Sequence, residues 1–228
     1  MKKLFCIALI MGLLLAGVSM AHAADVQNGE FDLMYYAGGL SGSGTTGYDS
    51  TTAPGYLARF GYFTGGPLKL GLDYAMNTNN TNNFSNKIND LKFHVKYAPW
   101  RTRTYNFGIG LFYNSLRYDS CFRNPATNAL VSGGATFNGL GLGVDGRVKM
   151  SEKTGFYGQI DYAPSLSGSI NGVDTKLDTM TYEFGLNFHT KESMMIKLGY
   201  RSSALKNKTT PNRDTTLSGL LIGLGFDF

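Results

Sequence analysis

The sequence contains few of the residues that catalytic and metal sites use most often. Of its 228 residues only two are cysteines, Cys6 and Cys121, and only three are histidines. Cys6 lies in an apolar N-terminal segment, so Cys121 has no partner for an internal disulfide bond and is expected to be an ordinary loop thiol. No His, Cys and carboxylate residues occur together at the spacing of a metal site, and we expect neither a metal nor a cofactor.

Charged residues are also scarce, at 16% of the chain, compared with roughly 25% in ordinary soluble domains. The net charge is only +5, and two of the basic residues are Lys2 and Lys3. This balance gives no indication of binding to nucleic acid. The abundant residues are glycine (30), Phe (15) and Tyr (14), a composition that favours a β protein in contact with lipid.

The longest apolar run lies at the N-terminus. Two lysines precede the run LFCIALIMGLLLAGV, and the segment ends in SMAHA, with small residues at Ala21 and Ala23. This pattern is typical of a secretory signal peptide, and an uncleaved anchor helix is the alternative. We predict a signal peptide over residues 1–23, cleaved after Ala23, and a single domain over residues 24–228. No later run reaches the roughly 20 apolar residues that a transmembrane helix needs.

Apolar and polar residues alternate with a period of two from residue 30 onward, which is the pattern of β-strands with two different faces. The alternation predicts about ten strands, at residues 30–38, 55–64, 67–76, 90–98, 104–118, 137–150, 155–163, 178–189, 194–204 and 215–228. Short turns such as TGGP and SEKT alternate with long loops rich in Asn, Ser, Thr and Gly. We therefore predict an all-β, closed, antiparallel up-and-down transmembrane barrel. Eight or twelve strands are the alternatives, since the first strand is the least regular.

The two faces of the predicted strands differ in charge. One face is apolar, and the other is rich in glycine and carries nearly all the strand charges. A Lys or Arg facing lipid at mid-depth costs about 2–4 kcal/mol, so the segregation separates a lipid face from a lumen. A soluble antiparallel sandwich is the alternative. The expected lumen charge network consists of Arg59, Asp73, Lys92, Asp145, Arg147, Asp161, Glu183, Lys197 and Arg201.

Residue counts from the short turns place some of these charges near one another. Three pairs are expected: Glu183 opposite Arg201, Asp73 diagonal to Arg59, and Arg147 near Asp161. Buried charges need partners because their desolvation is costly. The interior of a barrel of eight strands is just wide enough to be filled by side chains, and ten strands give slightly more room. The lumen is therefore expected to be closed by the charges, or to pass only small solutes.

The chain ends in LSGLLIGLGFDF, an alternating strand pattern that finishes on an aromatic residue. With the signal segment and the alternating short turns and long loops, it resembles the small outer-membrane β-barrel proteins of Gram-negative bacteria, such as the OmpA- and OmpX-like barrels. The resemblance implies a place in the outer membrane of the cell envelope, contact with lipid and lipopolysaccharide, short turns in the periplasm, and insertion by the barrel-assembly machinery. It implies an assembly signal at Leu220, Ile222, Leu224, Phe226 and Phe228.

Motifs of enzymes are weak or missing in the sequence. GLGVDG (residues 141–146) has the spacing of a dinucleotide-binding loop, but it lies inside one predicted strand instead of before a helix. Omptin proteases use Asp–Asp and Asp–His pairs near the extracellular rim, whereas His94 is expected at mid-strand and His189 beside a short turn. Neither histidine has the His-x-Ser motif of the lipid A deacylases.

The sequence thus predicts a small non-enzymatic barrel with a structural or surface-interaction role. Its long extracellular loops would contact a ligand. A narrow pore for ions or small solutes is the alternative, and an outer-membrane enzyme is the third possibility.

Overall fold

The structure is a computed structural model, and it describes residues 28–42, 51–81, 84–101, 104–123, 130–170, 172–191, 193–209 and 214–228. The predicted signal peptide lies outside these residues. In the described ranges, no helix is long and apolar enough to cross a membrane.

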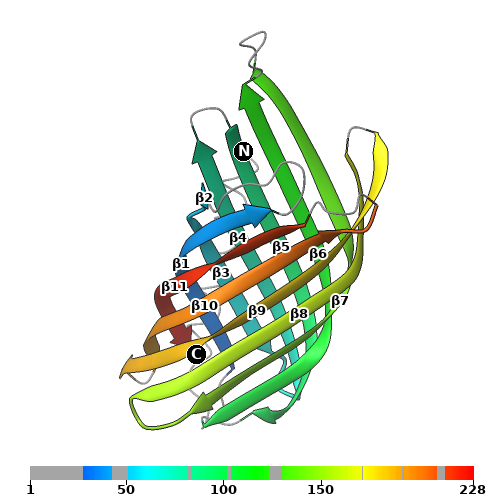
Figure 1. The fold of residues 1–228 in the computed structure, drawn as a ribbon. Helices are drawn as coiled ribbons and strands as arrows, with labels where there is room; N and C mark the ends of the chain where they lie inside the picture. Colours follow the sequence, from blue (N-terminus) through cyan, green and yellow to red (C-terminus); the bar gives the residue numbers. More distant parts are fainter. Residues whose placement is uncertain are drawn as a thin grey trace, which may run out of the picture.

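Nearly all the described residues belong to β-strands. The strands are β1 (Gly29–Gly42), β2 (Thr51–Thr52), β3 (Gly55–Phe63), β4 (Leu68–Thr81), β5 (Phe84–Arg101), β6 (Tyr105–Arg123), β7 (Leu130–Lys149), β8 (Thr154–Ile170), β9 (Val173–Lys191), β10 (Met194–Asn207) and β11 (Thr215–Asp227). Each long strand pairs antiparallel with the next, β3 pairs with β1, and β11 pairs with β1. The short β2 pairs with Gly39 and Leu40 of β1, beyond the point where the pairing of β1 with β3 ends. The predicted closed barrel of ten wall strands is therefore confirmed (Figure 1).

The pairing of β1 with β11 closes the barrel. It runs from Glu30 opposite Asp227 to Gly42 opposite Thr215, so neither strand is left as an open sheet edge. The backbone N–H groups of Asn28 and Gly29 both donate to the carbonyl oxygen of Phe228, each at 2.7 Å. The Phe228 ring stacks on the Phe60 ring at 6.1 Å between centroids. The last residue of the chain thus joins the two ends of the sheet.

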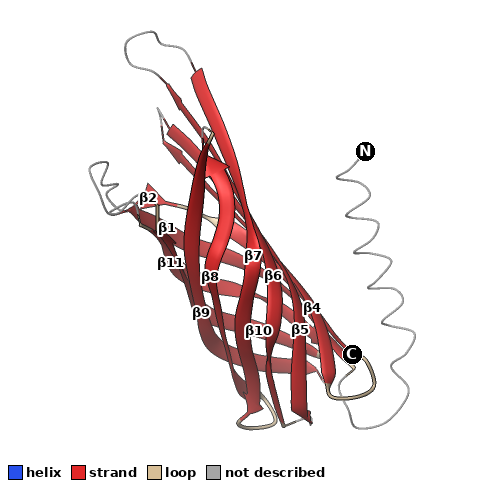
Figure 2. Ribbon diagram, turned by 90° about the vertical axis from the view of Figure 1, so that its right-hand side faces the viewer, coloured by secondary structure: helices blue, strands red, loops and turns tan. Residues whose placement is uncertain are grey.

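The two ends of the barrel differ in shape. The connections between β3 and β4, and between β7 and β8, are four residues long, and the chain terminates at this end, which we call the turn end. At the opposite end, which we call the hairpin end, β4–β5, β6–β7 and β8–β9 project to different heights, and the β6–β7 hairpin rises furthest (Figures 1 and 2).

The predicted strand bounds are accurate at the turn end and too short at the hairpin end. β5 begins at Phe84 instead of residue 90, β7 begins at Leu130 instead of residue 137, and β8 ends at Ile170 instead of residue 163. Parts of the predicted Asn-rich and Ser-rich loops are strands. Cross-strand pairing continues there, but the apolar-polar alternation fades because the outward positions carry polar side chains such as Ser85, Lys87 and Ser167.

The outward face of the barrel is apolar. Many of its large apolar side chains are exposed, including Leu33, Leu91, Phe93, Ile109, Leu111, Leu140, Leu142, Ile160, Phe184, Leu198, Leu220 and Ile222. A contiguous apolar band of this extent is not found on ordinary soluble monomers and marks a membrane-facing surface. Tyr35 and Tyr56 pair edge to face on this surface, with 5.6 Å between ring centroids.

The interior has two chemically different halves. The half towards the turn end holds buried charges, which we call the charged half. The half towards the hairpin end contains an apolar cluster together with a few buried amide and hydroxyl side chains (Asn77, Asn79, Asn86, Thr175 and Thr179), and we call it the apolar half. The apolar cluster consists of Met34, Tyr36, Leu40, Ala53, Leu57, Ala75, Ile88, Phe112, Leu116, Ala135, Phe137, Ala163, Leu166, Leu177, Leu217 and Leu221.

Candidate functional site: the ionic network of the lumen

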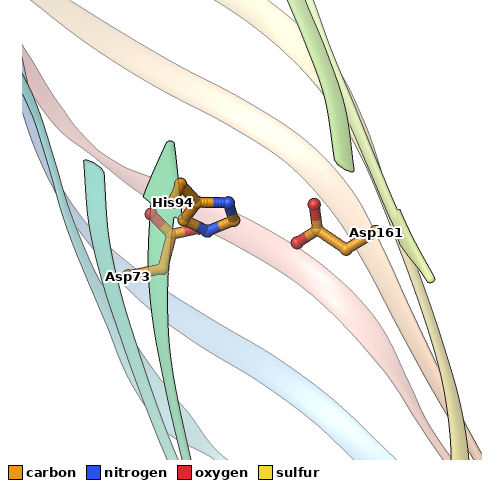
Figure 3. A group of neighbouring side chains, drawn as sticks. All are labelled: Asp73, His94 and Asp161. Carbon is orange, nitrogen blue, oxygen red and sulfur yellow. The ribbon is translucent and has the colours of Figure 1, made fainter. Parts of the chain in front are cut away.

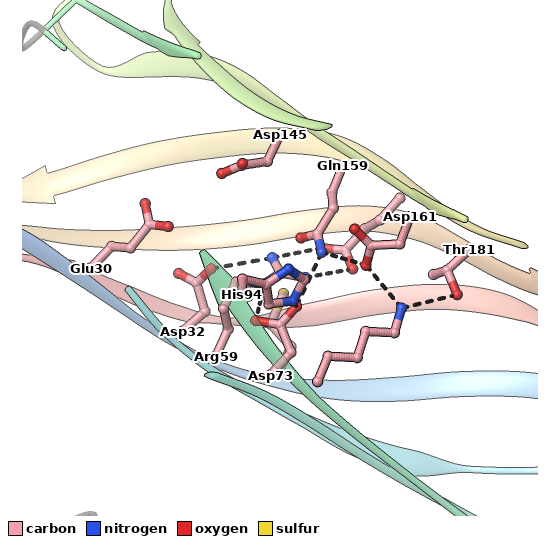
Figure 4. Close-up of polar contacts among 12 residues, drawn as sticks. Glu30, Asp32, Arg59, Asp73, His94, Asp145, Gln159, Asp161 and Thr181 are labelled. Carbon is pink, nitrogen blue, oxygen red and sulfur yellow. Dashed lines mark hydrogen bonds and ion pairs between the residues drawn. The ribbon is translucent and has the colours of Figure 1, made fainter. Parts of the chain in front are cut away.

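Arg59 is at the centre of the charged half. It projects inward from β3, and its guanidinium reaches across the lumen to Glu183 of β9, with Nη1 donating to Oε1 at 3.3 Å and Nη2 to Oε2 at 3.1 Å. Its Nε lies 3.4 Å from Oδ1 of Asp73, and its Nη1 lies 3.6 Å from Oδ2 of Asp32. A fork of two parallel hydrogen bonds to a carboxylate is both strong and directional. Arg59 therefore links three strands of one wall to the opposite wall (Figure 4).

The cations around Arg59 are paired in the same way. Arg201 donates to Glu183 at 3.2 Å and lies 3.6 Å from Asp90. Lys197 of β10 donates to Asp32 of β1 at 2.5 Å. Arg201, Glu183, Lys197 and Asp32 are buried and Asp90 is partly buried, so each charge requires a partner of opposite sign.

Lys92 and Gln159 make the remaining hydrogen bonds across the charged half. Nζ of Lys92 donates to Oδ2 of Asp161 at 2.8 Å and to the Thr181 hydroxyl at 3.4 Å. The Gln159 amide donates to Oδ2 of Asp161 at 2.8 Å and to Oδ2 of Asp73 at 3.1 Å, so one neutral side chain bridges two carboxylates. These nine charged residues, together with His94 beside Asp73, form what we call the central cluster: Asp32, Arg59, Asp73, Asp90, Lys92, His94, Asp161, Glu183, Lys197 and Arg201.

A second group of charges lies nearer the turn end. Lys69 donates to Glu30 at 2.5 Å and to Asp145 at 2.7 Å, and Lys96 lies 2.9 Å from the same Asp145. Lys69 and Lys96 are directly opposite each other in the register of β4 and β5, and Asp145 offsets the repulsion between them. Arg147 completes the group by donating to Glu30 at 3.1 Å and to Asp227 at 2.5 Å. These six residues form the end cluster: Glu30, Lys69, Lys96, Asp145, Arg147 and Asp227.

The structure brings together two of the three expected pairs. Arg201 is opposite Glu183 in register, as expected, and Arg59 is directly opposite Asp73 instead of diagonal to it. The expected proximity of Arg147 and Asp161 is wrong. Asp161 is opposite Gly143 and binds Lys92, whereas Arg147 is opposite Tyr157 and binds Glu30 and Asp227. The two residues belong to different clusters because the hairpin offsets them by four positions on β7.

Several network members were not on the expected list. Asp32, His94, Lys96 and Gln159 lie at inward positions that the alternation alone indicates, whereas Glu30, Asp90 and Asp227 lie at or near the ends of predicted strands. The apolar half was also missed. Its signal is an apolar side chain at an inward position, as at Met34, Leu57 and Phe112.

Glycines leave room for the large inward side chains. A Cβ atom added at Gly199 would collide with the Tyr157 hydroxyl, and one added at Gly185 would collide with the Tyr157 ring and the backbone of β10. Lys197 in turn lies over the Tyr157 ring, with Nζ 4.1 Å from the centroid. The cavities that remain are small: three in the lumen have volumes of about 20, 30 and 10 Å³, room for one or a few waters each.

The sequence matches the outer membrane protein beta-barrel domain family over residues 11–228. The chain belongs to this family. The family places the protein in the outer membrane of a Gram-negative bacterium, with the apolar outer face of the barrel in contact with lipid. A comparison with curated proteins finds no match.

Several solved outer-membrane barrels are similar in fold. The crystal structure of the outer membrane protease OmpT from Escherichia coli has a TM-score of 0.55 and 9% identity, covering 91% of this chain and 99% of that one. Neisserial surface protein A has a TM-score of 0.46 and 12% identity, covering 88% and 97%. The translocator domain of the autotransporter NalP from Neisseria meningitidis has a TM-score of 0.48 and 10% identity, covering 100% of this chain and 98% of that one. At these identities the similarity to OmpT shows a shared fold and nothing about a shared activity.

The two histidines and the cysteine of the described barrel lie in three different parts of it. His94 is buried in the central cluster, and its Nε2 lies 3.2 Å from Oδ2 of Asp73. His189 is partly buried near the turn end, beside the connection from β9 to β10. Cys121 was expected in a loop, but it lies within β6, in the projecting part of the barrel.

Proposed function

We propose that this protein is a closed, non-enzymatic outer-membrane barrel with a structural or surface-interaction role. The observation that carries this proposal is the filling of the lumen along its length. Ion pairs join opposite walls in the charged half, and the apolar half continues the filling towards the hairpin end. A barrel without a continuous water-filled path has no route for solutes.

The apolar half supports a closed barrel more strongly than the charges do. Four members of its cluster, Leu57, Phe137, Leu166 and Leu221, come from β3, β7, β8 and β11 and are almost completely buried. Side chains that line an aqueous channel are polar, because water must wet them. An interior of packed Leu, Phe and Met side chains is instead a hydrophobic core inside a barrel.

The projecting hairpins supply a surface for interaction. With the short turns in the periplasm, as the resemblance implies, the β4–β5, β6–β7 and β8–β9 hairpins project outside the cell. A groove of about 420 Å³ lies between β5, β6 and β7 and is lined by Ser85, Lys87, Arg117, Asp119, Ser120, Cys121, Ser132, Gly133 and Gly134. Its polar and charged lining suits a polar extracellular ligand or the headgroups of lipopolysaccharide.

Recordings of single-channel conductance in planar bilayers test the proposal. We expect the purified barrel to show no steady conductance. A steady conductance that changes on Glu183→Gln or Arg201→Ala would overturn the closed barrel in favour of a narrow pore, because these side chains cross the lumen. Arg117→Ala is the matched control, since Arg117 pairs with Asp119 in the projecting part of β6.

We also propose that β11 carries the assembly signal, through Leu220, Ile222, Leu224, Phe226 and Phe228. The inward positions of β11 include the glycines Gly219, Gly223 and Gly225. The outward positions carry apolar side chains that are available to a partner protein during insertion. Deletion of Phe228 is expected to reduce the outer-membrane fraction of the protein far more than deletion of a loop residue. Equal membrane fractions for the two deletions would refute the assignment.

A further inference from the structure

Three ionisable side chains from three strands meet in the central cluster. Asp73 of β4, His94 of β5 and Asp161 of β8 each offer one ligand atom, and these atoms all lie within 4.8 Å of one another. The relative exposures of the three residues are 5%, 3% and 1%. In Figure 3 the imidazole of His94 lies between the two carboxylates. The sequence gives no hint of this group, because its members are far apart in the chain.

His94 has no hydrogen bond among the residues that the structure describes, although it is buried. Neither Nδ1 nor Nε2 has a partner of acceptable geometry, and the nearest carboxylate oxygen to Nε2 is Asp73 Oδ2 at 3.2 Å. Buried polar groups are nearly always hydrogen-bonded, so an imidazole without a partner needs an explanation. Oδ1 of Asp161 also has no partner within the described part of the chain.

The charges of the lumen do not balance: the two clusters together hold eight carboxylates and seven permanent cations, and Lys96 of the end cluster also acts electrostatically on Asp73 and Asp161. The end cluster has three carboxylates and three cations. The central cluster has five carboxylates (Asp32, Asp73, Asp90, Asp161 and Glu183) and four permanent cations (Arg59, Lys92, Lys197 and Arg201). With His94 neutral, one negative charge is left uncompensated in a buried site, which is costly.

We propose that Asp73, His94 and Asp161 bind one divalent transition-metal ion of the zinc type inside the barrel. One imidazole nitrogen and two carboxylate oxygens suit Zn²⁺, Co²⁺ or Ni²⁺ better than the all-oxygen shells that Ca²⁺ and Mg²⁺ prefer. Asp161 coordinates through Oδ1, and its Oδ2 keeps its bonds to Lys92 and Gln159. Arg59 and Gln159 hold the Asp73 carboxylate in place, as outer-shell partners do for metal ligands.

A small cavity adjoins two of the three proposed ligands. It has a volume of about 10 Å³, about that of one water molecule, and is lined by Asp73, His94 and Gln159 but not by Asp161. A zinc-type ion with three protein ligands binds water in its fourth position and makes it easier to deprotonate. An ion that carries a hydroxide adds one net positive charge, which offsets the one excess carboxylate of the two clusters.

Metal titration of the untagged protein in detergent micelles tests the site. After treatment with a chelator, we expect one Co²⁺ or Zn²⁺ ion per chain, with a visible Co²⁺ absorption band that Zn²⁺ abolishes. His94→Gln and Asp161→Asn are each expected to weaken binding at least about tenfold. His189→Gln is the matched control, because it removes the other histidine of the barrel and should leave binding unchanged.

The outcomes separate the metal site from its rival, a proton on His94. Absence of stoichiometric binding by the wild-type protein overturns the proposal, and so does binding that His94→Gln leaves intact. Each variant is checked for the shift in gel migration between heated and unheated samples, which reports a folded barrel. If His94→Gln does not fold, Asp161→Asn and the histidine ring NMR signals of the wild-type protein decide, since bound Zn²⁺ must shift the His94 signals and leave those of His189 in place.

Discussion

Along β1 the inward side chains change from Glu30 and Asp32 near the turn end to Met34, Tyr36 and Leu40 towards the hairpin end. On β5 and β9 the charged side chains also lie nearer the turn end than Ile88 and Leu177, but the buried Asn86, Thr175 and Thr179 lie beside these two apolar residues. The barrel wall is continuous, but its two halves are filled by different kinds of interaction. The charged half is joined by directional bonds across the lumen, and the apolar half by close packing.

The two halves should respond differently to mutation. Loss of one member of a buried ion pair leaves its partner charged and unpaired in a site with little water, and typically costs 3–5 kcal/mol. Loss of an apolar side chain removes transfer free energy and leaves a cavity, and the cost depends on how far the surroundings relax. The charged half also joins particular strands across the lumen, such as β3 and β9 through Arg59 and Glu183.

The largest effect is expected at Glu183. Glu183→Gln keeps the side-chain volume but removes the carboxylate that Arg59 and Arg201 share. We expect the free energy of unfolding to fall by about 3–5 kcal/mol. Urea titration in lipid vesicles, followed by gel migration, measures this loss. A loss below that of the Leu57 variant described next would show that the ion pairs are not the stronger constraint.

A smaller loss is expected in the apolar half. Leu57→Ala removes a buried side chain from the middle of the cluster. The expected cost is about 2–4 kcal/mol, and the same urea titration measures it. Leu57→Met, which nearly conserves volume, should cost less than about 1.5 kcal/mol. If the alanine variant were as stable as the wild-type protein, the apolar half would be loosely filled, and the closed-barrel proposal would weaken.

The glycines that border the charged half give a third test. Gly199→Val places a side chain against the Tyr157 hydroxyl and the backbone carbonyl of Phe184. Overpacking of this kind costs about 1–3 kcal/mol, measured by the temperature at which the barrel loses its folded gel mobility. Gly158→Ala is the control, since an added Cβ there has its nearest neighbours at 3.6 Å or more. A harmless Gly199→Val would mean that Tyr157 can move aside.

The smallest effect is expected outside the lumen. Arg117 is paired with Asp119 at 2.9 Å, but its side chain is 64% exposed. Exposed ion pairs contribute about 0–1 kcal/mol, so Arg117→Ala should leave the urea midpoint nearly unchanged. A loss as large as that of Glu183→Gln would contradict the distinction between buried and exposed pairs.

The sequence-based strand predictions are accurate where one face of a strand meets lipid and less accurate elsewhere. Where one strand face meets lipid, the alternation is strict, and positions such as Leu33, Ile160 and Leu220 were assigned to the outer face correctly. In residues 84–89 and 164–170 the outward positions are polar, so the sequence predicts loops where the structure has strands, although Ile88 and Leu166 belong to the apolar half. Pro164 lies at the irregularity between Ala163 and Leu166 of β8, where a bulge tolerates a residue without an N–H group.

The sequence alone determined the barrel, its strand number to within the alternatives, and the residues that face inward, because each of these depends on a period of two along one strand. The tertiary structure alone decided which inward charges meet. Arg147 and Asp161 lie on neighbouring strands but bind partners from other parts of the barrel, and Asp73, His94 and Asp161 converge from three strands. Such contacts depend on the stagger between strands and on the reach of side chains across the lumen, which no local pattern encodes.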